Sequence, residues 1–477
     1  MKLSFLLQQV SILDVHNFRD IELDHISHDS RQTTDTSIFI AIRGENFDGR
    51  RFINRCDAPV VFVDQLPEEN SEKTIIVVSN LRQTMAILSH EIYHRPSEQL
   101  KMIGITGTNG KTTTSWMLSH LLQTLGQKVG VIGTLGHQIN GSLLSKQDGH
   151  TTPEAPEIHR MLRHFVDQDC NACIMEVSSI GIAMHRSDAL DFDVLGFTNF
   201  TQDHLDFHGS MEEYFKAKKQ LIVDYPSQKT IIILNQDQEK IASIPVKKGR
   251  RFGFGQASEA DWRLLSQQHS LKGIHFSFLF QGKEFSANLP LVGAHNIENA
   301  LVAISAAYGL GFPIIDILSA LESLPQAPGR LEHIPSPKGW HAFVDYAHTP
   351  DALEKSLSTL RKLHPNRLVV VFGCGGDRDQ GKRPLMGQIA EQLADQVFVT
   401  SDNPRSEDPQ QIIDDIVEGC QSVVFQHIDR KLAITKAIQT IGENDILLVA
   451  GKGHETYQII GQQILHFDDR EIIREQI

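Results

Sequence analysis

The sequence predicts an α/β fold with three domains, and three observations support this prediction. The chain has 477 residues, which is more than one hydrophobic core usually supports. Short apolar runs alternate with helical patterns, and one run leads into a glycine-rich segment of the phosphate-binding type. In the last third of the chain, strand, loop and helix patterns repeat in the way typical of a parallel sheet. We therefore predict domains at residues 1–98, 99–330 and 331–477.

The charge balance and the apolar pattern restrict the class of protein. The chain carries 45 Lys and Arg against 59 Asp and Glu, and the net charge of −14 argues against a nucleic-acid partner or an anionic membrane surface. No apolar run approaches the roughly 18 residues of a membrane span, and the apolar N-terminal segment is too short for a secretory signal. We expect a cytoplasmic enzyme without membrane insertion. Cys170 and Cys173 form a C-x-x-C pair, but the apolar run after Cys173 favours small core residues over redox or zinc chemistry.

The first 98 residues are expected to form a small α/β domain. Apolar runs at residues 37–42, 60–63 and 74–78 predict strands, and residues 81–93 predict a helix. The turns contain two polar segments, at residues 28–31 and 44–49. Such segments suit contacts with a polar ligand, but polar loops are common on any surface, so both interpretations remain open.

The central domain begins with the glycine-rich segment. Residues 102–105 predict a buried strand, and apolar residues at 117, 118, 121, 122 and 125 predict the helix that follows. Gly107 and Gly110 allow backbone N–H groups to approach an anion at the helix N-terminus, while Lys111 can reach the outer phosphates and Thr112 a Mg²⁺ ion. Ile105 stands where the general pattern has its first glycine, so the loop is a variant. We predict a P-loop ATPase domain with a mostly parallel sheet that binds ATP or GTP.

Acidic and histidine residues follow the next predicted strands, at residues 129–132, 172–175 and 194–197. Glu176 ends one of these strands, where a second Mg²⁺ ligand is expected beside a phosphate loop. Residues 203–208 contain two histidines and two aspartates, which either bind metal or cap the following helix. Lys218 and Lys219 alone predict a solvated helix face, and polar residues 293–299 open an alanine-rich helix where they could face a nucleotide base.

The C-terminal domain is predicted to be Rossmann-like. Apolar strands at residues 343–344, 368–372, 397–400 and 446–450 are each followed by a charged or glycine-rich segment, at residues 345–350, 373–383, 401–405 and 451–455. In an open parallel sheet, loops that follow strands emerge at the same edge. These four segments are therefore expected to converge on one binding site.

Several motifs together resemble the Mur ligase family. They are Thr106-Gly-Thr-Asn-Gly-Lys-Thr-Thr113, Glu176-Val-Ser-Ser179, Asn199 with Asp203-His-Leu-Asp206, His295-Asn296 with Asn299, Pro328-Gly-Arg-Leu-Glu332 and Asp345-Tyr-Ala-His348. Their order and spacing cover nearly the whole chain. Gly375-Gly-Asp-Arg-Asp379, Lys382-Arg-Pro-Leu-Met386 and Asp402-Asn-Pro-Arg405 resemble the members that add meso-diaminopimelate to the peptidoglycan stem peptide. The resemblance implies a ligase that uses ATP and Mg²⁺ to phosphorylate the carboxylate of a UDP-N-acetylmuramoyl dipeptide, which the amine of meso-diaminopimelate then attacks.

The resemblance also implies roles for residues of the ATP site. Lys111 neutralises the β- and γ-phosphates, Thr112 and Glu176 hold a first Mg²⁺, and His204 helps to hold a second. Lys218 matches a carbamylated lysine that serves as an anionic metal ligand, which reverses the prediction of a solvated face; Lys111, Lys218 and His204 are the implied catalytic residues. The nucleotide-binding matches are Gly107, Thr108, Asn109, Gly110, Lys111, Thr112, Thr113, His295, Asn296, Asn299, Arg330 and Asp345.

The other two substrates have their own implied contacts. For the UDP-linked dipeptide the matches are His28, Ser30, Glu45, Asn46, Phe47, His150, Thr151, Thr152, Ser178, Met184 and Arg186. For the amino acid the matches are Arg383, Asp402, Asn403, Pro404, Arg405, Gly451 and Glu455. The guanidinium of Arg405 can hold the second carboxylate of diaminopimelate in a bidentate pair, and Glu455 is available for an ammonium group. The chain departs from the residues usual in the family at His150, Ile180 and Met184.

Three other activities stay open, and a monomer is expected. The first is the same reaction with L-lysine. The second is a ligase similar to folylpolyglutamate synthase, which would share the ATP core without needing the loop at residues 402–405. The third is a P-loop nucleotide switch or kinase, which would use the phosphate loop without a carboxylate substrate.

Overall fold

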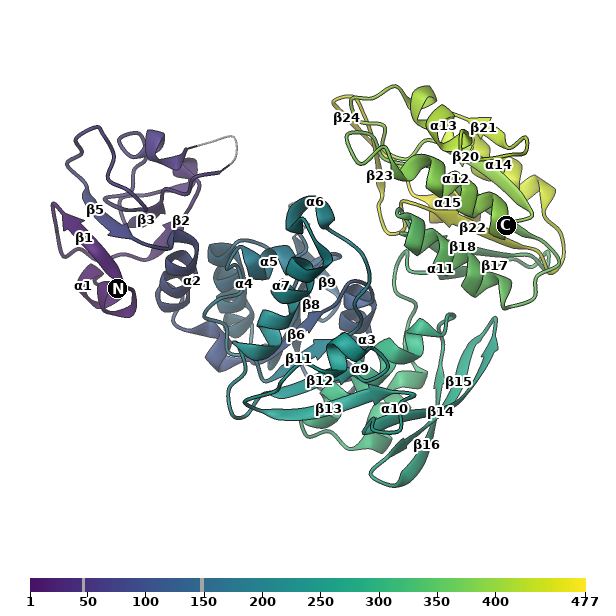
Figure 1. Ribbon diagram of the computed structural model, residues 1–477, viewed down its shortest axis with the longest axis horizontal. Coiled ribbons are helices and arrows are strands. Elements are labelled where there is room, and N and C mark those ends of the chain that lie inside the picture. The colour runs from purple at the N-terminus through teal and green to yellow at the C-terminus, as the bar shows by residue number, and fades with distance from the viewer. Residues whose placement is uncertain (45–47, 146–149) are drawn as a thin grey trace. The chain divides into compact units, whose positions relative to one another are not determined.

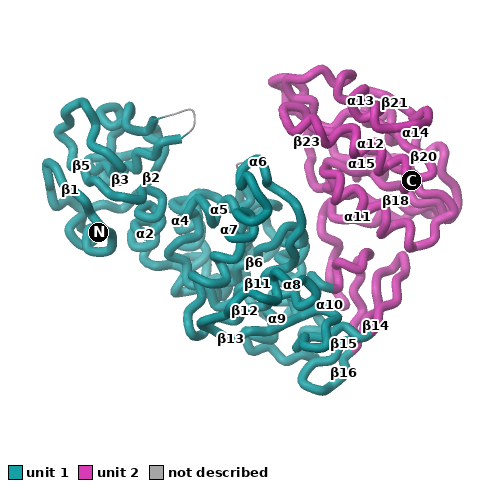
Figure 2. The backbone as a smooth tube through the Cα atoms, viewed as in Figure 1, with its two compact units in different colours: residues 1–265, 278–285, 298–321 teal, residues 266–277, 286–297, 322–477 magenta. Residues whose placement is uncertain are grey.

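The computed structural model describes residues 1–44, 48–145 and 150–477, in which helices pack against mostly parallel sheets (Figure 1). The predicted α/β class is therefore confirmed. The described residues form two compact units (Figure 2). Unit 1 contains residues 1–265, 278–285 and 298–321, and unit 2 contains residues 266–277, 286–297 and 322–477.

The first sheet has the strand order β1-β5-β4-β3-β2, in which all neighbours except β1 and β5 are parallel. Every residue of β4 and β5 is buried, as expected for continuous apolar runs in a parallel sheet. The elements are α1 (Leu3–Leu6), η1 (Leu7–Gln9), β1 (Ile12–His16), β2 (His25–Ser27), η2 (Ser30–Gln32), β3 (Ser37–Ile40), η3 (Gly49–Phe52), β4 (Val60–Val63), β5 (Thr74–Val78), α2 (Leu81–Ile92) and η4 (Pro96–Gln99). The strand predicted at residues 37–42 ends early, at Ile40, and Asn80 caps α2 by accepting from the Gln83 N–H.

The second sheet has the order β16-β15-β14-β13-β12-β11-β6-β10-β7-β8-β9. From β13 through β6 to β7 all neighbouring strands are parallel, while β8 and β9 are antiparallel additions. The strands are β6 (Lys101–Thr106), β7 (Val129–Gly133), β8 (Gly136–Ile139), β9 (Ser142–Ser145), β10 (Ala172–Glu176), β11 (Val194–Phe197), β12 (Ile231–Asn235), β13 (Arg250–Gly255), β14 (Trp262–Ser270), β15 (Gly273–Phe280) and β16 (Lys283–Leu289). The helices are α3 (Lys111–Thr124), α4 (Ala155–Asp167), α5 (Ser179–Ala183), α6 (Leu205–His208), α7 (Met211–Val223), α8 (Glu239–Ala242), α9 (His295–Gly309) and α10 (Ile314–Glu322).

Cys170 and Cys173 lie in the apolar core of this region. Both thiols are free and buried, and Cys173 is fully buried in β10. Burial raises the pKa of the Cys173 thiol far above its usual range, so the reactive thiolate is disfavoured. The interpretation as core residues is confirmed.

The third sheet has the order β17-β18-β22-β19-β20-β21, and its strands from β18 to β21 are all parallel. This is the Rossmann-like arrangement that the sequence predicted. The elements are β17 (Glu332–Pro335), β18 (His341–Asp345), α11 (Pro350–Arg361), β19 (Leu368–Phe372), α12 (Lys382–Leu393), β20 (Gln396–Thr400), α13 (Pro409–Val417), β21 (Phe425–His427), α14 (Arg430–Thr440), β22 (Ile446–Ala450), β23 (Tyr457–Ile460), β24 (Gln463–His466) and α15 (Asp469–Arg474). Thr349, Asp408 and Asp429 cap helices of this sheet through side-chain oxygens.

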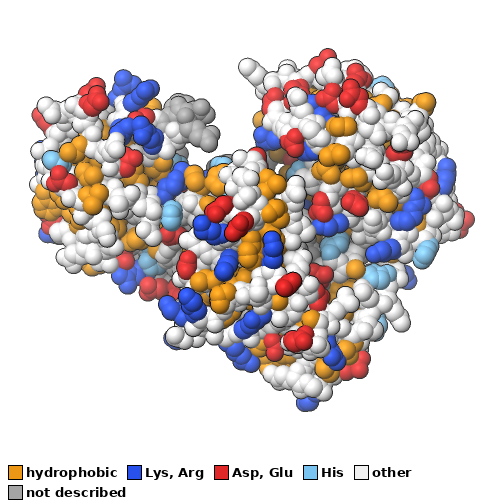
Figure 3. Space-filling model, in the orientation of Figure 1, with side chains coloured by type: hydrophobic (Ala, Val, Ile, Leu, Met, Phe, Trp, Pro, Cys, Tyr) orange, Lys and Arg blue, Asp and Glu red, His pale blue; other side chains and the backbone are white. Residues whose placement is uncertain are grey.

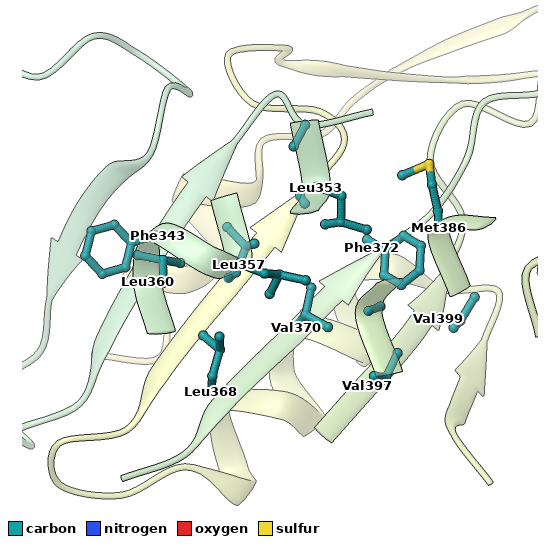
Figure 4. Packing of buried hydrophobic residues seen from close by; sticks show 14 of the residues in the cluster. Phe343, Leu353, Leu357, Leu360, Leu368, Val370, Phe372, Met386, Val397 and Val399 are labelled. Carbon is teal, nitrogen blue, oxygen red and sulfur yellow. The ribbon is translucent and has the colours of Figure 1, made fainter. Parts of the chain in front are cut away.

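Helices cover this sheet through buried apolar contacts. Leu353 and Leu357 of α11 face Val370 and Phe372 of β19, and Met386 of α12 lies beside them (Figure 4). Each buried leucine of this kind contributes about 1.5–3 kcal/mol through removal of its surface from water. The packing fixes the strand ends and therefore the loops that leave them.

The distribution of surface charge and the composition of the helices relate to two partners considered above, nucleic acid and a membrane. On the face drawn in Figure 3, acidic and basic side chains are interspersed, without a continuous basic area. Among the residues described by the structure, no helix has the length and apolar composition needed to cross a membrane.

Candidate active site

The phosphate-binding loop connects β6 to α3 as predicted. Gly107 and Gly110 have positive φ angles of +147° and +83°, which glycine adopts without strain. A Cβ atom on Gly107 would stand 2.0 Å from Thr198 Oγ1, and a Cβ atom on Gly110 would stand 2.2 Å from Asn299 Oδ1. Both glycines are therefore required by close approach as well as by backbone conformation.

Two lysine side chains meet at one backbone carbonyl of this loop. Lys111 Nζ donates to Gly107 O at 2.9 Å and to Thr108 O at 3.0 Å. Lys218 Nζ, from α7, donates to the same Gly107 O at 2.8 Å and lies 4.9 Å from the centre of the Tyr214 ring. Both side-chain nitrogens therefore lie at the loop that is expected to receive phosphates.

Lys218 is buried, so the prediction of a solvated face is wrong for this residue. Only 1% of its surface is exposed, while Lys219 is partly exposed. Burial holds the pKa of Lys218 well below its usual range, and the positive charge of Lys111 lowers it further. The negative charge of Asp203 opposes these two effects but does not outweigh them. The amine is therefore biased toward its neutral, nucleophilic form.

Glu176 joins the loop to its neighbours. Its Oε2 atom accepts from Thr112 Oγ1 at 2.9 Å and from Thr134 Oγ1 at 3.0 Å, and only 2% of the residue is exposed. Carboxylate and hydroxyl oxygens are ligands that Mg²⁺ prefers, so Thr112 and Glu176 fit this ion. Within residues 1–44, 48–145 and 150–477, no three His, Cys, Asp or Glu side chains are grouped to hold a metal by themselves. Phosphate oxygens and water would have to complete the coordination.

The histidine and aspartate segment does not cap the helix that follows. His204 adopts a left-handed conformation before α6 without a side-chain capping bond, and Asp203 Oδ1 accepts from the His204 N–H. Asp203 Oδ2 lies 3.5 Å from His204 Nε2. Burial lowers the pKa of His204, which favours the neutral imidazole that binds metals. His208, from the same segment, lies 3.0 Å from Ser179 Oγ through Nε2.

The other predicted nucleotide residues occupy both units. In unit 1, the Asn109 N–H donates to Asn199 Oδ1, Thr113 is buried in α3, and Asn299 Oδ1 accepts from Thr114 Oγ1 at 3.3 Å. In unit 2, His295 is exposed and Asn296 Nδ2 donates to Val292 O. Also in unit 2, the Arg330 guanidinium lies 4.9 Å from the Tyr346 ring centre, and the Asp345 carboxylate accepts from the N–H groups of Leu331 and Ala347.

A pocket of about 350 Å³ in unit 1 contains part of the predicted UDP-substrate site. His28 and His150 line it, together with Glu154 and Arg160, which the sequence analysis missed. Burial lowers the pKa of both histidines, so their neutral forms are favoured. Glu154 pairs with Arg186 at 2.8 Å and with Arg82 at 3.1 Å, so its carboxylate has two cationic partners.

Two remaining members of that predicted site, Thr152 and Ser178, support β10 and α5. Thr152 is fully buried, its Oγ1 donates to Glu176 O, and it accepts from the Ser178 N–H. Ser178 caps α5, Thr151 lies 3.3 Å from the Thr134 hydroxyl, Ser30 begins η2, and Met184 follows α5. Glu45, Asn46 and Phe47 lie outside the described residues.

The loops after the parallel strands of unit 2 converge as predicted. Asn403 Nδ2 donates to Glu455 Oε2 at 2.9 Å, and the Gly376 N–H donates to Asn403 O. A Cβ atom on Gly451 would stand 2.6 Å from Asp402 Oδ2. Arg405 has a left-handed conformation, and its Nη1 donates to Gly376 O at 2.7 Å. The segments at residues 373–383, 401–405 and 451–455 thus lie together, and the segment at residues 345–350 joins them, because Lys382 Nζ donates to His348 O at 2.8 Å.

Two basic residues of this region differ from the expectation. Arg383 is fully buried, and its terminal nitrogens pair with Glu407 and Asp415 at 2.8 Å each, so a contact with the amino acid remains a prediction. Lys452 was missed, although it is fully buried and donates to Asn403 Oδ1 at 3.2 Å and to Glu455 Oε2 at 3.0 Å. Its position between Gly451 and Gly453 in the last loop was the available signal.

Comparison with known proteins identifies the family of this chain. The model of the Mur ligase middle domain matches residues 105–307, and that of the Mur ligase glutamate ligase domain matches residues 329–453. The chain belongs to the Mur ligase family. This Mur ligase is similar to the UDP-N-acetylmuramoyl-L-alanyl-D-glutamate--2,6-diaminopimelate ligase of Clostridium botulinum, with 39% identity over 466 residues that cover 96% of this chain and 95% of that protein.

Two further relatives extend this similarity. The protein of the same name from Chlamydia caviae is 39% identical over 484 residues, which cover 100% of this chain and 99% of that protein. A solved structure of a UDP-N-acetylmuramoyl-L-alanyl-D-glutamate--2,6-diaminopimelate ligase matches this Mur ligase with a TM-score of 0.70 and 33% identity, covering 95% of this chain and 94% of that chain. The similarity therefore extends over nearly the whole chain.

Proposed function

We propose that this Mur ligase joins meso-diaminopimelate to the D-glutamate carboxylate of UDP-N-acetylmuramoyl-L-alanyl-D-glutamate, with ATP and Mg²⁺, in the synthesis of a peptidoglycan precursor. The observation that carries the proposal is the hydrogen bond of 2.9 Å between Asn403 and Glu455, which joins the two loops expected to bind the amino acid. The names of the clostridial and chlamydial relatives agree with this assignment.

The first chemical step uses the loop in unit 1. ATP supplies the phosphoryl group that converts the unreactive carboxylate into an acyl phosphate, and the incoming amine then displaces phosphate to form the amide. Lys111 is placed at the loop to neutralise phosphate charge, while Thr112 and Glu176 supply oxygens for Mg²⁺. Because little covalent chemistry is left to the protein, positioning and charge neutralisation are its main tasks.

We further propose that Lys218 is carbamylated in the active enzyme. Its buried amine has a lowered pKa, so the neutral nitrogen can attack CO₂, form an N–C bond and release a proton. The product is an anionic carbamate whose oxygens would serve as metal ligands together with His204. This replaces a buried neutral amine by an anion beside the expected metals, which lowers the cost of bringing the Mg²⁺ charge into this environment.

Recognition of the amino acid is assigned to the loops of unit 2. The guanidinium of Arg405 is proposed to bind the distal carboxylate of diaminopimelate, a group that lysine lacks. Glu455 is proposed to bind an ammonium group through Oε1, since Oε2 is already occupied by Asn403 and Lys452. Asp402, Pro404, Gly451 and Arg383 complete the predicted amino-acid contacts.

The division of labour among the domains is also part of the proposal. Residues 1–98 would bind the UDP-linked substrate, residues 99–330 ATP, and residues 331–477 the amino acid. The pocket lined by His28 supports a role of residues 1–98 in this binding, and His150 of the second domain lines it as well. We propose that the enzyme acts as a monomer, and in the cytoplasm because its nucleotide substrates are made there.

The test is phosphate release from ATP with the UDP-linked dipeptide, in parallel with meso-diaminopimelate and with L-lysine. Release that requires both the dipeptide and diaminopimelate is the expected result. Release with lysine would retain the ligase but refute the role of Arg405 in selecting the amino acid. No release with either amino acid, or release without the dipeptide, would refute the proposed reaction.

A further inference from the structure

A fully buried ion pair lies behind the amino-acid loops of unit 2. Arg430 is the first residue of α14, and its side chain and that of Asp469 at the start of α15 are both 0% exposed. Arg430 Nε donates to Asp469 Oδ1 and Nη2 donates to Asp469 Oδ2, each at 2.8 Å. The pair is therefore bidentate, which fixes the plane of the guanidinium.

The remaining hydrogen bonds of Arg430 end on two backbone carbonyls. Nη2 donates to Ala450 O at 2.9 Å, and Nη1 donates to Ser401 O at 3.3 Å. Ala450 is the last residue of β22, and Ser401 follows the last residue of β20. Ser401 is therefore the first residue of the segment 401–405, and Ala450 directly precedes the segment 451–455, the two segments that are proposed to bind the amino acid.

β20 and β22 are not neighbours in the sheet, because β19 lies between them. Their loops nevertheless meet beyond the end of β19, where a Cβ atom on Gly451 would stand 2.6 Å from Asp402 Oδ2 and 3.5 Å from Gly373 O. The ladders that join β19 to β20 and to β22 end at Val399 and Val449, so no sheet pairing extends into the two loops themselves. Arg430 contacts both segments at once, through Ala450 O and Ser401 O, and Asp469 fixes the orientation of its guanidinium.

We infer that Arg430 is a positioning residue for amino-acid binding: it sets the spacing between the loop of Arg405 and the loop of Glu455. This inference rests on the proposed function, because it assumes that the two loops bind the incoming diamino acid. A substrate with charged groups at both ends needs its two binding groups at one fixed distance, and a displacement of either loop would weaken both contacts together.

A purely structural role is the alternative, and it leads to different expectations. Buried ion pairs contribute little net stability, and apolar pairs of similar volume often replace them without loss. If Arg430 only supports the fold, an apolar replacement of the pair should leave substrate affinity unchanged. If it spaces the loops, the affinity for diaminopimelate should fall even in a stable variant.

The experiment compares Arg430→Lys and the double variant Arg430→Met/Asp469→Leu with wild type. Arg367→Lys is the matched control, because Arg367 pairs with Asp445 at the opposite edge of the same sheet. For both Arg430 variants we expect the KM for diaminopimelate to rise about tenfold while the KM for ATP stays within about twofold. The Arg367 variant should change neither KM. Hydrogen exchange should become faster at residues 401–405 and 451–455 in the Arg430 variants.

Several outcomes would overturn the inference. The first is an unchanged KM for diaminopimelate in a folded Arg430 variant, and the second is an unchanged rate of hydrogen exchange in both loops. The third is a decrease in kcat that is fully explained by a smaller fraction of folded enzyme. Failure of both Arg430 variants to fold would assign the pair a structural role and would also overturn it. Wild-type enzyme that does not turn over diaminopimelate would instead refute the proposed function, so the two failures are distinguishable.

Discussion

Replacement of Lys218 by alanine tests the chemistry of the ATP site most directly. The change removes three methylene groups and the buried amine, and the apolar part costs about 2 kcal/mol of unfolding free energy at about 0.8 kcal/mol per methylene. Gly107 O loses one donor but keeps its bond of 2.9 Å from Lys111, so no buried acceptor is left without a partner. The variant should therefore fold with moderately reduced stability.

The expected effect on activity is much larger. Loss of one group that stabilises developing charge typically costs about 10²–10³ in rate. Lys218→Ala should lose at least that factor in ATP-dependent phosphate release, and added bicarbonate should not restore it because alanine cannot form a carbamate. Wild-type enzyme should lose activity in CO₂-depleted buffer and regain it with bicarbonate.

Lys219→Ala is the matched control, since Lys219 is adjacent in sequence but partly exposed. It should behave as wild type in both buffers. Wild-type rates in Lys218→Ala would refute the assignment. Equal stimulation of Lys218→Ala and wild type by bicarbonate would also refute it, because the effect would then arise elsewhere.

Three other predictions address the loops and the core. Gly110→Ala should abolish ATP-dependent activity, because the new methyl group would stand 2.2 Å from a side-chain oxygen, whereas Gly126→Ala, with a similar φ angle but no atom within 4 Å, should remain active. Arg405→Ala should weaken use of diaminopimelate by about 2–5 kcal/mol, measured as kcat/KM, and an unchanged KM would contradict the proposed contact. Burial lowers the pKa of His159 from 6.5 to about 3. Between these two pH values the unfolded chain binds a proton that the folded chain does not. The free energy of unfolding therefore falls as the pH falls from 6.5 toward 3, by up to about 1.4 kcal/mol per pH unit. His159→Leu should flatten this decline in urea unfolding between pH 6 and 4, while His164→Leu, exposed on the same helix, should leave the slope unchanged.

Apolar runs and glycine positions made much of the fold predictable. β4, β5, β19 and β22 are uniformly buried, and each was visible as a short run of Val, Ile, Leu or Phe. Loops that follow parallel strands share an edge, so the meeting of Asn403 and Glu455 followed from topology alone. The atypical phosphate loop was recognisable because its strand and helix lie where anion binding requires them.

Side-chain burial was harder to infer, and Lys218 is the clearest case. Tyr214, Leu221 and Ile222 are buried at helical spacings of four, three and four residues from it, so the pattern of α7 already placed Lys218 on the apolar face. The prediction of a solvated face relied on the charge of Lys218 and neglected its position on the apolar face of the helix. Only the resemblance to the family corrected it.

Partners distant in sequence could not be predicted at all. Arg430 and Asp469 are separated by 39 residues, and nothing in either local pattern indicates the other. The same holds for Glu154 with Arg186, because Glu154 precedes α4 and Arg186 lies in the loop after α5. Such contacts follow from the assembled fold, and a single sequence carries no local signal for them.

The carbonyl of Gly107 has a consequence for how nucleotide binding should appear in calorimetry. Lys111 is already held by Gly107 O and Thr108 O, so a phosphate exchanges these two hydrogen bonds for its own and gains little net enthalpy. The same contacts have already removed rotamer freedom from a side chain that can otherwise lose about 2 kcal/mol of entropy on ordering. Binding at this loop should therefore show a small heat and a favourable entropy, because counter-ions and water leave while the lysine merely changes partners.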